Sequence, residues 1–182
     1  MTLSLDNYAY VFFVCEGTNE EEILKWICEN NKLCLDKSKY TLDYCRARAG
    51  QGKEELKKQC LQIDYGGPIV VVYLCDSRKE QWSLGKNAMG ENIPVIRIWT
   101  RPEIEILLIL SNEKLYDKWE RAKRKKHNIK PSEFCKSEVD HDIKKKGHFV
   151  DAFRNFQIFE ECCHKYKSRY NEEPCIYDLI AK

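Results

Sequence analysis

The chain has 182 residues, of which 43% are hydrophobic and 33% are charged, and this composition is ordinary for one soluble globular domain. No apolar run approaches the roughly 20 residues that a membrane-spanning helix needs, which excludes an integral helical membrane protein. The first residues lack the basic segment of a signal peptide, so we expect a mature cytoplasmic protein that contacts no membrane.

The chain contains ten cysteines, and no two of them have the C-x-x-C spacing of a zinc site. Several stand within apolar strand or helix patterns, where a free thiol behaves as a small buried hydrophobic side chain. We therefore expect reduced, structural thiols, as is usual in the cytosol.

The net charge of +2 conceals an uneven distribution. Residues 114–146 contain twelve Lys or Arg against six Asp or Glu, a local charge of +6, which leaves −4 for the remainder. A basic segment on an acidic body attracts polyanions, although such a segment is also often only a solvated surface.

The first part of the chain predicts alternating strands and helices. Residues 8–15 are a continuous run of apolar, β-branched and aromatic side chains, the pattern of a strand buried on both faces. Thr18 and Glu21 have the spacing of a capping box, which predicts a helix through about Asn30. In chain order, the expected strands cover residues 9–15, 41–47, 69–75 and 93–98, and the expected helices cover about 18–30, 53–63, 79–89 and 102–110. This order predicts an α/β fold in which a four-stranded, mainly parallel sheet carries helices on both faces.

The pattern changes after Ser111. We expect a charged helix over 113–127, a polar and irregular segment over 128–147 and a long amphipathic helix over 148–170. A short helix at 176–180 is expected to dock back onto the rest. The chain is therefore divided into a core, residues 1–112, and a basic helical extension, residues 113–182, which packs on the core as part of a single globular unit.

Two of the expected strands end in an acidic residue, Glu16 and Asp76. The carboxyl ends of parallel strands meet at one edge of a sheet, which is where ligands of such folds bind. A pair of carboxylates there is a hard oxygen site of the kind that Mg²⁺ prefers, and Gly17 would let a phosphate approach the helix N-terminus behind it. The alternative is that each acid only begins a polar loop.

Residues 11–24, VFFVCEGTNEEEIL, and residues 70–77, VVVYLCDS, resemble the two signature motifs of TOPRIM domains. These motifs are a strand-end Glu-Gly and a later strand-end Asp-x-Asp, and they occur in topoisomerases, primases and several nucleases. Residues 93–110, IPVIRIWTRPEIEILLIL, and residues 171–180, NEEPCIYDLI, are similar to segments of the RloB-like branch, a compact TOPRIM family associated with bacterial antiphage systems. The resemblance implies a TOPRIM-like sheet and a metal-dependent nuclease.

The resemblance also implies roles for four acids. Glu16 matches the first-motif glutamate, a metal ligand or general acid/base, and Asp76 matches the first aspartate of Asp-x-Asp. Glu21 matches a second acid of the first motif and would be a metal ligand, although the capping box with Thr18 already explains it. Glu105 matches an acid after the proline of the later segment. It is the acid of an otherwise apolar helix, and either catalysis or a structural salt bridge would account for it.

The sequence departs from the family at Arg78, which stands where the second aspartate of Asp-x-Asp is expected. An arginine there would clamp a phosphate in place of a second metal ion, because its guanidinium binds phosphate in a bidentate manner. The alternative is a site that has lost its activity. Glu80 is a weaker candidate for the missing carboxylate.

Basic residues supply the candidate nucleic-acid contacts. Lys118, Arg121, Arg124 and Lys125 recur at helical spacing, and Lys123 and Lys126 widen the same cationic face, which suits a phosphate backbone. Lys136 and the run Lys144, Lys145 and Lys146 fall where related proteins place a lysine that steadies a transition state, and the sequence does not choose among them. Asp140, His141 and Asp142 have the composition of a metal cluster, but a polar loop explains them better.

Two functions from different classes remain open. The first is a nuclease dependent on Mg²⁺ or Mn²⁺ that cleaves RNA or DNA as the effector of an antiphage defence system. The second is a catalytically degenerate TOPRIM module that binds nucleic acid or a partner protein as a sensor, scaffold or inhibitor. The resemblance alone implies an ABC- or AAA-type ATPase as a partner.

Overall fold

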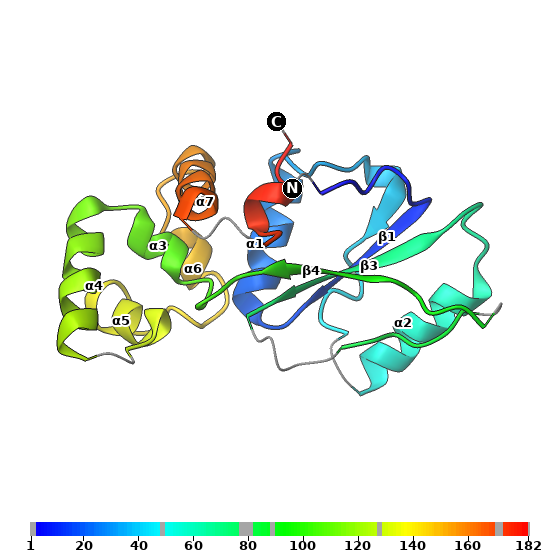
Figure 1. Cartoon of the computed structure of the whole chain (residues 1–182), viewed down its shortest axis with the longest axis horizontal. Coiled ribbons are helices and arrows are strands. Elements are labelled where there is room, and N and C mark those ends of the chain that lie inside the picture. Colours follow the sequence, from blue (N-terminus) through cyan, green and yellow to red (C-terminus); the bar gives the residue numbers. More distant parts are fainter. Residues whose placement is uncertain are drawn as a thin grey trace.

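The fold is α/β, built on a four-stranded sheet in which every strand pairs in parallel (Figure 1). The computed structural model describes residues 3–47, 50–76, 82–87, 90–126, 129–169 and 173–181. The strands are β1 (Tyr10–Cys15), β2 (Tyr40–Thr41), β3 (Ile69–Cys75) and β4 (Val95–Trp99), and they lie in the order β2-β1-β3-β4. The fold class expected from the sequence is confirmed.

The two central strands form because their side chains can be buried on both faces of the sheet. Phe13 and Val72 pack on one face, whereas Phe12 and Val71 pack on the other. A parallel sheet covered on both sides favours such continuous apolar, β-branched runs. The register pairs Cys15 with Leu74, so β1 and β3 end side by side.

Helices cover both faces, as expected. α1 (Thr18–Glu29) lies on one face, and the helices of the extension, which lie beyond the carboxyl ends of the strands, share one large apolar core with that face (Figure 1). On the other face, Leu56 and Cys60 of α2 (Gln51–Gln62) pack with Trp82 and Leu84 (Figure 1). No helix among the described ranges is long and apolar enough to cross a bilayer.

The helices of the extension are organised around α3 (Ile106–Leu110), a short, completely buried helix that precedes the extension in the chain. The helices α4, α5 and α7 pack against it. The bounds of the helices of the extension are α4 (Glu113–Lys125), α5 (Pro131–Glu138), α6 (His148–Asp151) and α7 (Phe156–Arg169). The described residues also form the short 3-10 helices η1 (Lys37–Lys39) and η2 (Ile176–Leu179).

The C-terminal segment returns to the sheet. The backbone N–H of Trp99 donates to the carbonyl of Pro174 over 2.8 Å, and Cys175 forms a parallel bridge with Trp99. The N–H of Ala181 donates to the carbonyl of Lys32 over 2.7 Å. The short terminal helix therefore docks back, as the sequence suggested.

β2 is much shorter than the strand expected over residues 41–47. Residues 43–47 turn, with the N–H of Ala47 bonded to the carbonyl of Tyr44 over 2.8 Å. The segment meets β1 again at one point, where the N–H of Cys15 donates to the carbonyl of Cys45 over 2.5 Å. An edge strand has a partner on one side only, so local turns compete with it effectively.

The described part of the expected helix 79–89 is a loop. The N–H of Ile93 bonds to the carbonyl of Gly85 over 3.1 Å, and the N–H of Asn87 bonds to the carbonyl of Glu91 over 2.8 Å. Gly85 and Gly90 have φ angles of 96° and 79°, which a helix does not contain.

The extension also differs from expectation. The irregular segment 128–147 contains α5, which starts at Pro131 and buries Phe134. The single helix 148–170 is two helices, because Asn155 caps a new start by accepting a hydrogen bond from the N–H of Ile158 over 3.0 Å. The helix expected from residue 102 begins at Ile106, after a cis peptide bond between Arg101 and Pro102.

Candidate functional site

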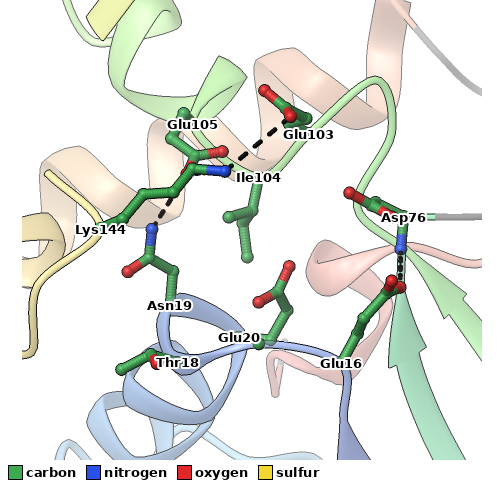
Figure 2. Close-up of a pocket in the computed structure, with 10 residues that line it drawn as sticks. Glu16, Thr18, Asn19, Glu20, Asp76, Glu103, Ile104, Glu105 and Lys144 are labelled. Carbon is green, nitrogen blue, oxygen red and sulfur yellow. Dashed lines mark hydrogen bonds and ion pairs between the residues drawn. The ribbon is translucent and has the colours of Figure 1, made fainter. Parts of the chain in front are cut away.

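A pocket of about 260 Å³ lies at the carboxyl ends of β1 and β3, where α1 begins and the extension meets the sheet. Figure 2 shows carboxylates from the strand ends, from α1 and from the segment before α3 gathered around one space, with Lys144 among them. The lining residues are Glu16, Gly17, Thr18, Asn19, Glu20, Asp76, Glu103, Ile104, Glu105 and Lys144.

Glu16 and Asp76, the two strand-end acids, lie together in this pocket. The register makes β1 and β3 end level, and the N–H of Glu16 bonds to the carbonyl of Leu74 over 2.9 Å. The N–H of Asp76 in turn donates to Oε2 of Glu16 over 2.9 Å (Figure 2). One strand end thus fixes the carboxylate of the other.

The electrostatics of this pair are unfavourable to two negative charges. Burial, the charge of Glu16 and a hydrogen bond between the two carboxyl groups raise the pKa of Asp76 to about 6, with a further contribution from Glu103. Lys144 opposes the effect. A cation at this point would relieve the repulsion.

Glu20 is the acid that the sequence reasoning missed. Its side chain is 7% exposed, and the hydroxyl of Thr100 donates to its Oε1 over 3.4 Å. Burial, together with the charges of Glu105, Asp76 and Glu16, raises the pKa of Glu20 to about 7.

The helical period was the signal that could have found Glu20. It lies three, four and seven residues before Ile23, Leu24 and Ile27, which form the buried face of α1. Gly17 makes room for it, because a Cβ at Gly17 would come within 2.7 Å of Oε2 of Glu20.

Glu21 does not line the pocket, so its expected part in the metal site is not supported by its position. Its carboxylate is bound by Nζ of Lys25 at 2.5 Å and by Nε of Arg46 at 2.6 Å. The capping box is wrong as well. Gly17 is the N-cap of α1 and has no side chain to accept a bond, while the hydroxyl of Thr18 accepts from Arg46.

Glu105 lies in the pocket wall and is 2% exposed. Nδ2 of Asn19 donates to its Oε1 over 3.1 Å, and Nζ of Lys144 lies 3.8 Å from the same oxygen. Burial raises the pKa of the Glu105 carboxyl, and Lys144 opposes this. The structural salt bridge considered for this residue is therefore present, and it is formed inside the pocket.

Glu103 is a second acid that the sequence reasoning did not select. Its Oε1 lies 3.9 Å from Nζ of Lys144, and its Oε2 accepts from the N–H of Ser132 over 2.9 Å. The lysine ammonium is therefore held between two carboxylates of the segment that precedes α3 (Figure 2).

Of the four candidate lysines, Lys144 is the one that lines the pocket. Lys145 bonds to Asp142 at 2.8 Å, and Lys136 and Lys146 are exposed. His141 and Asp142 contact each other, and Asp140 accepts from the N–H of Asp142 over 2.8 Å. These contacts agree with the polar-loop interpretation.

The cationic face lies on α4, at the outer end of the extension and away from the strand ends (Figure 1). Lys118 is paired with Glu138 at 2.8 Å, and Lys123 is paired with Glu120 at 3.2 Å beside the ring of Trp119. The remaining members, Arg121, Arg124, Lys125 and Lys126, are exposed. Cations in the last turn also stabilise the helix dipole.

Two further candidates, Arg78 and Glu80, lie outside the described residues. All ten cysteines are free thiols and most of them are buried.

The donor set fits one hard cation better than two. Within the described ranges, no group of three or more His, Cys, Asp or Glu side chains is close enough to enclose a metal ion. Mg²⁺ commonly needs only one or two protein carboxylates, because water and substrate phosphate complete its shell. Glu16 and Asp76 meet that requirement.

Comparisons with protein-family models, with curated proteins and with solved structures gave no match to this chain.

Proposed function

We propose that this chain is a TOPRIM-type nuclease of the RloB-like kind that hydrolyses phosphodiester bonds of RNA or DNA with Mg²⁺ or Mn²⁺. The observation that carries the proposal is the pairing of Glu16 and Asp76 at adjacent parallel strand ends inside an open pocket. The resemblance of the flanking motifs adds the nuclease class and a role as the effector of an antiphage system with an ATPase partner.

Glu16 and Asp76 would hold the metal ion, which supplies Lewis-acid activation of the phosphate and of a nucleophilic water. Glu20 lines the same pocket, where burial raises its pKa, so its carboxylate would serve as the base that accepts a proton from this water. In the hydrolysis, a water oxygen bonds to phosphorus and the bond from phosphorus to the leaving oxygen breaks. Glu20 takes the proton of the water, and solvent protonates the leaving oxygen.

Two positive features would bind the substrate phosphate. The N-terminus of α1 beside Gly17 has no hydrogen bond from a capping side chain, and the backbone N–H groups of a helix N-terminus favour anions. Lys144 lines the opposite wall and can exchange its ion pairs with Glu103 and Glu105 for a phosphate oxygen. On the exposed face of α4, Arg121, Arg124 and Lys126 would contact the backbone of a long substrate.

One observation favours the second candidate, a binding module without catalysis. Lys144 already forms ion pairs with both Glu103 and Glu105, so these acids are less available to a second metal ion. Arg78 adds a further positive charge in the sequence where the related motif has an aspartate. A protein with one weak cation site would bind nucleic acid and cleave nothing.

A cleavage assay with Mg²⁺ or Mn²⁺ over a panel of transfer RNA, other single-stranded RNA and DNA tests the proposal. Wild type should cut at least one substrate, Glu16→Gln should not, and Glu29→Gln should behave as wild type because Glu29 is exposed at the far end of α1. Binding of the same substrates is measured in parallel. Binding without cleavage, in the presence and absence of a candidate ATPase, would favour the binding module.

A further inference from the structure

Lys144 is carried by a loop that is closed on itself. We define the lysine loop as residues 140–148. Its two ends are joined by Asp140 and His148, whose Oδ2 and Nδ1 atoms lie 2.6 Å apart. Inside the loop, the N–H of Lys145 bonds to the carbonyl of Asp142 over 2.6 Å, and Ile143 is completely buried.

Two side chains of α1, one helical turn apart, fasten this loop to the helix that starts at the acid cluster. Oε1 of Glu22 accepts from the N–H of Gly147 over 2.6 Å, and Nδ2 of Asn19 lies 3.5 Å from the carbonyl of Ile143. Gly147 has a φ of 88°, a conformation that a residue with a Cβ rarely adopts. The carboxylate of Glu22 therefore binds the loop at a position that favours glycine.

The surroundings of Glu22 indicate that its hydrogen bond to Gly147 has a specific role. Its second oxygen, Oε2, is buried and has no hydrogen-bond partner among the described residues. Burying a carboxylate oxygen without a hydrogen-bond partner costs free energy. We infer that the hydrogen bond made by the other oxygen of Glu22 offsets this cost. That oxygen holds the loop that carries Lys144.

We propose that Glu22 is a positioning residue that holds Lys144 at the pocket through the lysine loop, and so sets the affinity of the site for a phosphate group. The phosphate as ligand rests on the proposed function, whereas the anchoring of the loop does not. α1 then carries both halves of the site, since it places Glu20 beside the strand-end acids and anchors the lysine on the opposite wall.

Substitutions separate this role from a general structural one. Glu22→Ala frees the N–H of Gly147, whereas Glu22→Gln keeps an acceptor oxygen and should preserve the contact. Lys144→Met removes the cation itself. A charged hydrogen bond is worth about 1.5–3 kcal/mol, so its loss should weaken phosphate binding by about tenfold or more. Glu22→Ala should act in the same direction, and the double variant should be no weaker than Lys144→Met alone.

Two measurements with the full chain form the test, with inorganic pyrophosphate and Mg²⁺ as the binding probe. Titration calorimetry gives the affinity, and hydrogen–deuterium exchange reports on residues 140–148. We expect Glu22→Ala to weaken binding and speed exchange in the loop, and Glu22→Gln and the surface control Glu29→Ala to leave both unchanged.

The proposal is overturned if Glu22→Ala leaves exchange in the loop unchanged, or if its effect on binding simply adds to that of Lys144→Met. If wild type binds neither pyrophosphate nor an oligonucleotide, the proposed function and the affinity part of this inference fall together, while exchange in the loop still decides the anchoring. If Glu22→Ala does not fold, Glu22→Leu takes its place as the variant that lacks an acceptor oxygen. Glu22→Gln, which keeps this oxygen, is then compared with Glu22→Leu in the same two measurements.

Discussion

The backbone N–H of Asp76 donates to the carboxylate of Glu16 over 2.9 Å, so the ends of β1 and β3 are joined through a side chain of the candidate metal site. This contact orients Glu16 before any ligand arrives. It also keeps two acids close together at a cost in repulsion, which is the arrangement expected of a site built for a cation.

Glu16 accepts a hydrogen bond that joins the strand ends, and it supplies a negative charge for a metal ion. Glu16→Gln should separate these two roles. The amide oxygen can still accept from the N–H of Asp76, so the free energy of unfolding should change by less than about 1 kcal/mol. The lost charge should lower the pKa of Asp76, because Glu16 raises it in the wild type. Mn²⁺ affinity, followed by calorimetry, should fall severely. Unchanged Mn²⁺ binding would place the metal elsewhere.

The stability of the metal-free protein should fall as the pH rises from about 4.5 to 7. The pKa values of Glu20 and Asp76 are about 7 and about 6 in the folded chain, above their ordinary values of 4.5 and 3.8. The folded state therefore binds more protons than the unfolded state in this window, and raising the pH removes that stabilisation. Urea denaturation at pH 5 and pH 7.5 measures the difference.

Two comparisons make the pH experiment specific. Glu20→Gln should flatten the plot of unfolding free energy against pH. A saturating divalent cation should flatten it as well, because the bound ion replaces the protons on the carboxyl groups and stabilises the folded state by mass action. A wild-type profile that is flat without metal would mean that neither carboxyl is perturbed as described.

Gly17→Ala should damage the site with little effect on the fold. A Cβ at Gly17 would come within 2.7 Å of Oε2 of Glu20 and would displace that carboxylate. The backbone itself is extended there, with φ at −134°, and tolerates alanine. We expect a loss of Mn²⁺ affinity and cleavage. Gly52→Ala in α2 is the matched control, since its Cβ would meet nothing closer than 3.5 Å.

Charge reversal of Lys123, Arg124 and Lys126 should weaken nucleic-acid binding without unfolding the chain. Each lost phosphate contact should flatten the slope of log K against log salt by about 0.7 to 0.9. Each reversal near the end of α4 should cost about 0.3–1 kcal/mol of stability through the helix dipole. Fluorescence anisotropy at several salt concentrations measures the slope.

The control for α4 reverses the same amount of charge elsewhere, at Lys37, Lys58 and Lys165, which are exposed and lie outside α4. If both triple variants lose affinity equally, the effect is one of net charge. If the α4 variant binds as wild type does, its cations are a solvated face.

Arg78 tests whether the site works with one metal ion. If Arg78 clamps the phosphate, Arg78→Ala should abolish cleavage and leave Mn²⁺ affinity at Glu16 and Asp76 intact. Arg78→Asp should raise metal affinity, because a carboxylate replaces a repelling cation. Arg78→Lys keeps the charge and loses the bidentate geometry. A wild type that cuts nothing, with cleavage appearing only in Arg78→Asp, would identify a site that has lost its activity.

The sheet and the pairing of Glu16 with Asp76 could be predicted because they follow from local signals. A run such as residues 69–75 is both strand-forming and buried, and the acid after it must lie at the strand's carboxyl end. Glu20 was missed because a capping interpretation of Glu21 displaced the simpler test of helical period, which places Glu20 on the buried face of α1.

The length of β2, the choice of Lys144 and the place of Glu103 depend on contacts between distant parts of the chain, which no local sequence pattern contains. β2 ends after Thr41 because an edge strand lacks a second partner. Lys144 was one of four equivalent lysines in the sequence, and its selection depends on Gly147 meeting Glu22 across a large separation along the chain. Glu103 likewise becomes part of the pocket only when α5 and the lysine loop pack around it.

The bond between Trp99 and Pro174 has a consequence for synthesis on the ribosome. The outer edge of β4 receives this partner only after the whole helical extension has been made. Until then the edge presents unpaired peptide groups, the feature by which nascent chains associate wrongly with one another. We therefore expect this edge of β4 to be completed only after residues 174–175 have left the ribosome, and chains that end before these residues to depend on chaperones more than chains that contain them.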